Sequence, residues 1–308
     1  MRSFSITLKL LRIIIIMKAS THDGRFHADE IFALAVLNLF YPDLEIIRSR
    51  DENVYKNNDI IVDVGYVYDP DNLIFDHHQR SFSLKRESGI LYASFGLVWK
   101  QYGELLCGSS ETSEYIDSVI VQAIDADDNG IDIYETKING IGLHTLSDII
   151  ESFVPRHVDD DDKVQKGFDR ALNFATSYMK RQIKLAKELF EVALPNIRNA
   201  IEVAENPRIL IFKMFDKTWL NFISRESEEA LFVIFPTHRK TWAIRSVPKR
   251  GQKFEYCKLL PAEWGGRQKD FAGISDVHDA LYCHNGCFLA EAKSLEGADK
   301  LAGIALEN

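Results

Sequence analysis

The fold of this 308-residue chain is decided by the stretch Asp59-Ile60-Ile61-Val62-Asp63-Val64-Gly65. Its apolar centre is continuous rather than alternating, which is typical of a strand buried on both faces in a parallel sheet. Two shorter apolar runs lie on either side of it, Leu44-Glu45-Ile46-Ile47 and Leu73-Ile74-Phe75. Helical patterns separate these strands, so the sequence predicts an α/β fold with a parallel sheet in the N-terminal half.

The first helix is expected directly after a polar loop, His22-Asp23-Gly24-Arg25-Phe26-His27. Apolar residues then recur at helical spacing from Ile31 to Leu39. Asp29 stands before that run, where a carboxylate can accept the first backbone N–H groups of a helix. Two more helices are expected near residues 89–106 and 113–125.

A chain of this length suggests two domains. Residues 17–160 form the predicted first domain. A long helical pattern over about 163–193 lies in a predicted linking segment, residues 161–205. Residues 206–308 are β-rich and end in a helical pattern near 294–305, which predicts a smaller α/β domain.

The formal net charge is −9. A chain this acidic does not bind polyanions through bulk electrostatics, so any nucleic-acid contact must be local or metal-mediated. The four cysteines lack the spacing of a disulfide scaffold, which favours a reducing compartment such as the cytoplasm. No apolar run is long enough to span a bilayer, so we expect no membrane partner. The oligomeric state stays open.

Residues 1–22 contain no acidic side chain and include a short apolar run, Ile13 to Ile16. Such a segment is either a mitochondrial presequence or an upstream extension with Met17 as the functional start. We favour the extension.

Histidines and carboxylates follow the ends of successive predicted strands. They are His22, His27 and Asp29 after the first segment, Asp63 after the buried strand, Asp76-His77-His78 after the third strand, and Asp125 and Asp128 in the run 125–130. Each group alone is compatible with an ordinary turn or polar loop. Together they would gather at the carboxyl edge of the sheet, where so many charges are costly unless a cation holds them. Mixed imidazole and carboxylate ligands suit Mn²⁺, Fe²⁺, Co²⁺ or Zn²⁺.

Several of these blocks resemble the melanocyte-proliferating-gene-one family, which is related to the DHH phosphoesterases. The matching blocks are Thr21-His22-Asp23-Gly24-Arg25-Phe26-His27-Ala28-Asp29-Glu30, Val62-Asp63-Val64-Gly65, Phe75-Asp76-His77-His78-Gln79-Arg80-Ser81-Phe82, Asp125-Ala126-Asp127-Asp128-Asn129-Gly130 and Cys283-His284-Asn285-Gly286. The resemblance implies a DHH-like parallel-sheet domain with a metal site, joined by a long helix to a smaller α/β domain. It also implies 3′-to-5′ RNA exonuclease activity, which eukaryotic members perform in nucleus and mitochondria.

One departure from the superfamily pattern is the opening motif. The superfamily usually has His-x3-Asp-x-Asp, whereas here the spacing is His22-x4-His27-x-Asp29. A histidine therefore stands where a carboxylate is expected, and the loop is one residue longer.

The resemblance leads us to expect two cations, Mn²⁺ by ligand type with Mg²⁺, Co²⁺ or Zn²⁺ as alternatives, roughly 3.5–4 Å apart. His22, His27 and Asp63 would hold one cation. The other would be held by Asp29, Asp63, His77 and the acidic run of Asp125 and Asp128. A metal-activated water would then attack phosphorus.

The remaining residues of these blocks are expected to handle the substrate. His78 would contact phosphoryl oxygens, Asp76 would orient a ligating imidazole, and Arg80 would donate a fork of N–H groups to phosphate. Arg80 is equally compatible with a salt bridge on its loop.

The second half contains a basic stretch, with seven Lys and Arg residues against one Glu over 239–258, and with interleaved aromatic residues. This pattern favours binding of single-stranded nucleic acid, although a solvated edge strand also accounts for it. The candidate substrate-binding residues are Arg245, Lys249, Arg250, Arg267 and His284. The spacing Cys283-x3-Cys287, beside His278 and His284, is interpreted as a packed strand and loop rather than a zinc site.

We therefore expect an enzyme, a divalent-metal phosphoesterase that acts as a 3′-to-5′ exonuclease on single-stranded RNA or short oligonucleotides. One alternative is a catalytically silent sensor that binds a nucleotide in the same cleft. Another is a metal-dependent hydrolase of non-phosphate substrates. The sequence leaves the choice among RNA, DNA, oligonucleotide and pyrophosphate open.

Overall fold

The computed structural model describes residues 16–308 except 139, 157–159, 216–221 and 253. The leader or extension expected at residues 1–16 therefore lies, apart from its last residue, outside the described residues, as does Lys253 of the basic stretch. The chain divides into two compact units, Met1–Ala186 and Lys187–Asn308. The domain limits expected at residues 160 and 205 stay a prediction.

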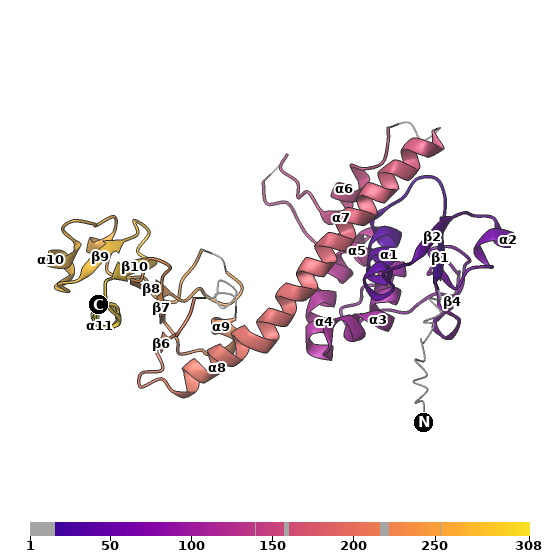
Figure 1. Ribbon diagram of the computed structural model, residues 1–308. Coiled ribbons are helices and arrows are strands. Elements are labelled where there is room, and N and C mark those ends of the chain that lie inside the picture. Colours follow the sequence, from indigo (N-terminus) through magenta and orange to yellow (C-terminus); the bar gives the residue numbers. More distant parts are fainter. Residues whose placement is uncertain (1–15, 139, 157–159, 216–221, 253) are drawn as a thin grey trace, which may run out of the picture. The chain divides into compact units, whose positions relative to one another are not determined.

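The first unit is built on a five-stranded sheet (Figure 1). Its strands are β1 Lys18–Thr21, β2 Glu45–Arg48, β3 Ile60–Val62, β4 Tyr68–Asp69 and β5 Ile74–Phe75. They lie in the order β2-β1-β3-β5-β4, and all neighbours are parallel except β4, which runs antiparallel to β5. The parallel sheet predicted from the buried stretch is confirmed.

Helices pack around this sheet, and all but one contribute to its core. They are α1 Ala28–Phe40, α2 Glu52–Tyr55, α3 Ser94–Cys107, α4 Ser110–Ile116, α5 Gln122–Asp128, α6 Leu146–Glu151 and α7 Asp161–Glu188. The exception is the short helix α2, whose Tyr55 packs with Ile61 and Val64 in a separate cluster. A π-helical turn over Asp117–Val121 joins α4 to α5, and a 3₁₀ turn over Pro70–Asn72 joins β4 to β5. Every residue of α1 from Ala28 to Leu37 is buried, because the helix packs against both α3 and the sheet.

The long helix α7 carries one apolar stripe at helical spacing, as the sequence predicts. The stripe consists of Val164, Phe168, Ala171, Ala175, Met179, Ile183 and Ala186. All of these side chains are buried in the core of the first unit. The chain passes into the second unit near the end of this helix, through a π-helical turn over Leu189–Ala193.

The second unit has a mixed five-stranded sheet in the order β6-β7-β8-β10-β9. Its elements are α8 Leu194–Glu202, β6 Ile209–Ile211, α9 Ile223–Glu226, β7 Phe232–Pro236, β8 Trp242–Ser246, a 3₁₀ turn over Ala262–Trp264, α10 Phe271–Ser275, β9 Ala280–Cys283, β10 Leu289–Ala292 and α11 Leu295–Glu307. Only β6 and β7 pair in parallel among these described strands. The sequence did not predict β10, whose two alanines and one glutamate have low β-propensity.

Among the described residues, no helix combines the length and the apolar character needed to cross a bilayer.

The parallel register of β3 and β5 places the loops that follow these two strands next to each other. Ile61 pairs with Ile74 and Val62 with Phe75, so the residues after β3 and β5 leave the sheet side by side. The backbone N–H of Asp63 still donates to the carbonyl of Phe75 at 3.0 Å. The carboxyl ends of β1, β3 and β5 therefore meet at one edge of the sheet, as expected for parallel neighbours.

Candidate metal centre

Asp63 lies at the centre of the candidate site, and each of its carboxylate oxygens faces two imidazoles. Its Oδ1 lies 3.6 Å from Nε2 of His77 and 3.5 Å from Nδ1 of His78. Its Oδ2 lies 3.4 Å from Nε2 of His22 and 3.9 Å from Nδ1 of His27. The residue has a left-handed φ of 55° directly after β3, a conformation that turns the chain sharply at the strand end.

Glu30 joins His22 and His27 on the Oδ2 side of Asp63. Its Oε1 is 3.1 Å from Nε2 of His22 and its Oε2 is 2.9 Å from Nδ1 of His27. Glu30 is fully buried. It was not among the predicted site residues, although its place three residues after His27 puts both on one face of α1.

Charge complementarity holds these groups in their ionised forms. Burial alone would lower the pKa of His22, but the carboxylates of Asp63 and Glu30 raise it to about 10. Burial alone would raise the pKa of Glu30, but His22 and His27 lower it below its usual range. The pKa of Asp63 is lowered as well, because its imidazole neighbours outweigh its desolvation. In the absence of a cation, protons on the imidazoles balance the buried carboxylates.

His77 and Asp128 form the opposite side of the site. Nε2 of His77 lies 3.1 Å from Oδ2 of Asp128 and 4.0 Å from Oδ2 of Asp29. Burial alone would lower the pKa of His77, but Asp128 and Asp63 raise it to about 11. The pKa of Asp29 is raised by burial and by the neighbouring carboxylates of Asp128 and Asp63.

Asp29 was expected to cap the first helix, but the structure shows that it caps a different one. The helix α1 begins at Ala28 with His27 as its N-cap, so Asp29 does not cap its own helix. Its carboxylate instead accepts the backbone N–H groups of Ser94 at 2.9 Å and Phe95 at 2.7 Å, at the start of α3. Asp29 therefore ties α3 to the site through the free N–H groups of that helix end.

Asp76 holds His78, the imidazole predicted to contact phosphate rather than metal. Its Oδ1 accepts both Nδ1 of His78 at 2.8 Å and the backbone N–H of the same residue at 3.0 Å. Its Oδ2 accepts the backbone N–H of Tyr66 at 2.7 Å. The hydrogen bond from His78 to Asp76 raises the pKa of the imidazole.

Three buried polar atoms in the site make no well-aligned hydrogen bond. They are Nε2 of His22, Oδ2 of Asp63 and Nε2 of His77. The two imidazole nitrogens among them face carboxylate oxygens, and the carboxylate oxygen faces imidazole nitrogens. Such orphaned atoms are costly in a protein interior. A cation that the imidazole nitrogens and carboxylate oxygens share would satisfy them, so these residues fit a divalent metal.

The described residues form three groups whose ligand atoms lie within 4.8 Å of one another. The groups are His22, His27, Glu30 and Asp63; Asp63, His77 and His78; and Asp29, His77 and Asp128. The first contains the predicted set of His22, His27 and Asp63. The third brings Asp128 beside His77, whereas Asp125 belongs to none of these groups.

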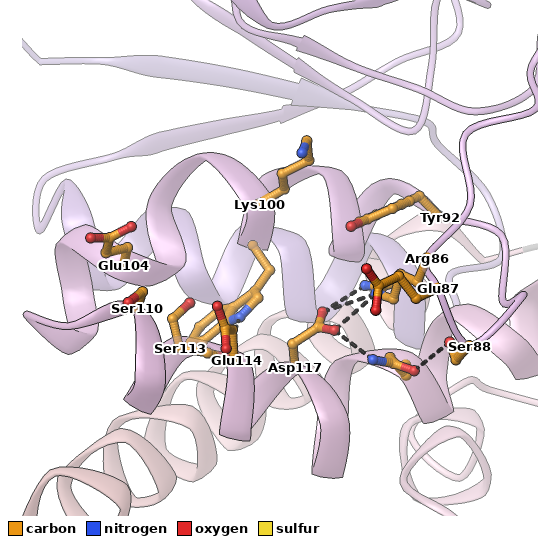
Figure 2. Close-up of a pocket in the computed structure, with 12 residues that line it drawn as sticks. Arg86, Glu87, Ser88, Tyr92, Lys100, Glu104, Ser110, Ser113, Glu114 and Asp117 are labelled. Atoms are coloured by element: carbon orange, nitrogen blue, oxygen red, sulfur yellow. Dashed lines mark hydrogen bonds and ion pairs between the residues drawn. The ribbon is translucent and has the colours of Figure 1, made fainter. Parts of the chain in front are cut away.

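Asp125 is instead held by an arginine. Its Oδ2 accepts Nη1 of Arg86 at 2.7 Å and its Oδ1 accepts the backbone N–H of Gly96 at 3.0 Å. Burial raises the pKa of Asp125 to about 7, although Arg86 opposes that shift. Figure 2 shows Arg86 also pairing with Asp117, at the wall of a separate cavity of about 580 Å³ that is not lined by the histidines of the site.

A cavity of about 220 Å³ borders the candidate site at His27, Asp29 and Asp128. A second cavity at the site is small, about 80 Å³. It is lined by His22, His27, Arg50, Asp63, Val64, Tyr66, Asp76 and His78. Arg80, the arginine predicted to bind phosphate, is exposed on the loop after β5 and is not one of these lining residues. Arg50 lines the cavity but was not predicted, because the strand before it carries no functional motif.

The basic candidates of the second unit divide into two groups. Arg245 and His284 share one partner, since the Arg245 guanidinium lies 5.5 Å and the His284 ring 4.2 Å from the ring of Phe288. The ring of Tyr256 stacks on the same Phe288 at 5.4 Å.

The other basic candidates are exposed. Lys249 pairs with Glu255 at 3.4 Å and Arg267 pairs with Asp270 at 2.9 Å, and Arg250 is exposed as well. Of the basic candidates, the structure thus brings Arg245 and His284 together around Phe288. No sequence motif had identified this aromatic side chain as a candidate substrate-binding residue.

Cys283 and Cys287 are both buried and free. Burial raises the pKa of the Cys283 thiol to about 12, so it stays protonated at neutral pH.

Comparison with known proteins gives a match over nearly the whole chain. A family model named MYG1_exonuc, described as "Uncharacterised protein family (UPF0160)", matches residues 18–306. A MYG1 protein of Dictyostelium discoideum is 29% identical over 307 residues, which cover 90% of this chain and 93% of that protein. A MYG1 exonuclease of Mus musculus is 27% identical over 321 residues, which cover 94% and 84% of the two chains. A crystal structure of RecJ in complex with Mn²⁺ from Thermus thermophilus aligns with a TM-score of 0.29 and 14% identity, over 94% of this chain and 52% of that one.

Proposed function

The chain belongs to the MYG1 family, UPF0160, and from this membership and its site we propose that it is a divalent-metal-dependent nuclease. The family resemblance seen in the sequence motifs is thereby confirmed. Relatives that this chain matches over most of their length bear the name MYG1 exonuclease.

The observation that carries the proposal is the position of Asp63 between two pairs of imidazoles. One cation would be held by His22, His27, Glu30 and Asp63. The second would be held by Asp29, His77 and Asp128, with Asp63 shared between the two. Two Mn²⁺ ions suit this mixture of nitrogen and oxygen ligands, and Co²⁺, Zn²⁺ or Mg²⁺ are the alternatives.

When bound, such ions supply Lewis acidity and activate water for attack on a phosphodiester. The chain's own residues orient the reactants. Asp76 accepts Nδ1–H of His78 and so fixes the ring, which leaves Nε2 of the protonated imidazole to donate to a phosphoryl oxygen. Asp76 thus positions the phosphate-binding imidazole rather than a metal ligand.

We further propose that the substrate is single-stranded RNA or a short oligonucleotide, degraded from its 3′ end. The first domain would carry the reaction and the second would hold the strand. Support comes from the Arg245 guanidinium and the His284 ring against Phe288, since cations beside aromatic rings suit a flexible strand. We also propose a reducing intracellular compartment, because the four cysteines lack the spacing of a disulfide scaffold.

A turnover assay with purified, chelator-stripped and Mn²⁺-reloaded protein tests the proposal. Single-stranded RNA labelled at its 5′ end should shorten one nucleotide at a time, whereas a 5′-to-3′ enzyme would release the label at once. A dinucleotide and pyrophosphate are assayed in parallel to define the substrate class. Tight nucleotide binding without turnover would instead identify a sensor, and hydrolysis of amides alone would identify a different hydrolase.

A further inference from the structure

The size of the cavity beside His22, Asp63 and His78 limits what can enter it. Its volume of about 80 Å³ is well below the roughly 300–1,000 Å³ of sites that enclose whole small molecules. Ions, water and a phosphoryl group fit there, but a nucleobase does not. The sugar and base of a nucleotide therefore lie outside this cavity, and its rim offers them Arg50 and Tyr66, on the side away from the cavity of about 220 Å³ that borders Asp29 and Asp128.

Arg50 supplies hydrogen-bond donors that can bind a phosphate at this rim. It lines the cavity together with His22 and Asp63. Its Nε lies 3.5 Å from Oδ1 of Asp23, and the two side chains are 60% and 56% exposed. An exposed pair of this kind is weak, so the guanidinium can turn to an incoming phosphate at little cost. Its planar fork of N–H groups matches two phosphate oxygens.

Tyr66 supplies an exposed aromatic face at the same rim. It is 65% exposed, although large aromatic residues are usually buried. Its ring stands edge to face with His78, with 6.2 Å between centroids and 68° between planes. Because so much of the residue is in contact with solvent, its ring is available for stacking with a planar group.

The backbone holds Tyr66 there in a sparsely populated conformation. Tyr66 has a left-handed φ of 58°, in a loop where Asp63 and Gly65 also have positive φ values of 55° and 112°. The Tyr66 N–H donates to Asp76 at 2.7 Å, which fastens this loop to the residue that also holds His78. A non-glycine residue kept in this region next to a reactive site indicates a constraint on its position.

We propose that Arg50 and Tyr66 form a subsite for one terminal nucleotide, in which Arg50 binds the phosphate and Tyr66 stacks on the base. The inference rests on the proposed nuclease function and extends it. Because every base offers a planar face, a stacking contact of this kind accepts all four bases. The subsite therefore favours release of single nucleotides without sequence preference.

Calorimetric binding of AMP and of inorganic phosphate to the Mn²⁺-loaded protein tests this subsite. Wild-type protein should bind AMP more tightly than phosphate. Tyr66→Ala should weaken AMP roughly 5- to 100-fold, the loss of one stacked base, and leave phosphate unchanged. Tyr66→Phe should retain AMP binding, while Tyr66→Leu, which keeps bulk without a planar ring, should not.

Arg50→Ala should weaken AMP and phosphate alike, by roughly tenfold or more as expected for a lost charge-assisted bond. The matched control is Arg170→Ala, an exposed arginine on α7, which should change neither affinity. Metal content is measured for every variant, so that a loss of Mn²⁺ is recognised separately.

Three results would overturn the subsite: equal affinity of wild-type protein for AMP and phosphate, an unchanged AMP affinity in Tyr66→Ala, or an unchanged phosphate affinity in Arg50→Ala. Failure of the proposed function has a different signature. In that case wild-type protein cleaves no RNA, whatever the outcome of the AMP measurements.

Discussion

The carboxylate of Glu30 holds both the backbone and the side chain of His27. Its Oε1 accepts the His27 N–H at 3.0 Å, and its Oε2 lies 2.9 Å from Nδ1 of the same residue. One buried acid therefore caps the start of α1 and fixes an imidazole of the metal centre. The histidine that replaces the expected carboxylate in the opening motif is thus accompanied by a carboxylate from the next turn.

Replacing this acid should weaken metal binding more than it weakens the fold. Glu30→Gln keeps the shape and an acceptor for the His27 N–H, but removes the charge shared by His22 and His27. We expect the affinity of one cation to fall at least about 10- to 100-fold, since even groups that only orient metal ligands contribute that much. Calorimetric Mn²⁺ titration and metal analysis of dialysed protein measure this effect.

The matched control for that experiment is Glu52→Gln, at an exposed glutamate in the first turn of α2 that pairs with Lys56. It should leave Mn²⁺ binding unchanged. If Glu30→Gln binds both cations as wild-type protein does, Glu30 serves only as a helix cap.

The sequence predicts the sheet well, because a buried strand needs a continuous apolar run and residues 60–62 provide one. The same pattern places Asp63 and Asp76 at neighbouring strand ends. Glu30 is hidden from such a prediction, since a charged residue within a helix normally faces water. Glu30 lies in the site only because α1 is buried on all sides, which the sequence pattern does not reveal.

The sequence also could not show which of Asp125 and Asp128 lies beside His77 as a candidate metal ligand. The two residues lie three apart on α5 and project to the same side of the helix. The structure separates them because Arg86, brought in from a distant loop, pairs with Asp125 and leaves Asp128 beside His77. No local pattern around residue 86 signals that long-range contact.

Loss of the shared ligand should abolish activity. We expect Asp63→Ala and His77→Ala each to reduce RNA cleavage by at least about a hundredfold, since even residues that only support ligands contribute 10- to 100-fold. The measurement is the cleavage rate of Mn²⁺-reloaded protein after removal of other metals. Full activity of either variant would show that the metal centre lies elsewhere, and circular dichroism confirms that both variants are folded.

Removal of Arg86 should destabilise the first unit in a pH-dependent manner. Its nearly buried guanidinium pairs with Asp117 and Asp125, each at 2.7 Å. Arg86→Ala leaves Asp125 buried without its counter-ion, which costs about 3–5 kcal/mol. The pKa of Asp125 is already about 7, above its ordinary value of 3.8, so the fold favours the protonated acid.

The sign of that pH dependence follows from the raised pKa of Asp125. Arg86 opposes the rise in the pKa of Asp125, so its removal raises that pKa further. The variant therefore goes on losing stability as pH rises above about 7, where Asp125 of the wild-type protein is already ionised. The variant's free energy of unfolding in urea should therefore fall further below that of wild-type protein above pH 7 than below it. Equal losses on both sides would mean that lost packing, rather than the unpaired Asp125 charge, is responsible, and Asp125→Asn combined with Arg86→Ala should recover part of the loss.

Binding of metal should release protons from the histidines. In the metal-free fold the pKa of His22 is about 10 and that of His77 about 11, so both imidazoles are protonated at neutral pH. A ligating imidazole must be neutral, and the pKa of His27 is raised as well. Loading should therefore release at least about two protons, and metal affinity should rise with pH. Calorimetry in buffers of different ionisation enthalpy counts the protons, and a heat independent of the buffer would contradict this prediction.

The same two imidazoles make the metal-free fold sensitive to alkaline pH. Because folding raises their pKa above the ordinary value of 6.5, their contribution to stability is complete below pH 6.5 and is lost as pH rises through about 10 and 11. Thermal melts of chelator-treated protein should show this decline. Mn²⁺ should remove it, because the bound cation replaces the protons.

The position of α3 gives a further prediction at Gly96. A Cβ at this residue would overlap the carboxylate of Asp125 and crowd the Arg86 guanidinium, whereas Gly303 in α11 has open space around the same atom. Gly303→Ala should therefore stabilise the protein by up to about 1 kcal/mol, the usual helix preference of alanine over glycine. Gly96→Ala should instead cost about 1–3 kcal/mol through overpacking.

A double-mutant cycle identifies the carboxylate as the cause of that cost. In an Asp125→Ala background the added methyl group has room, so Gly96→Ala should cost less than in wild-type protein, with a coupling energy of about 0.5–3 kcal/mol. Urea unfolding of the four proteins supplies the free energies. Additive losses would show that Gly96 is needed for a reason other than the close approach of Asp125.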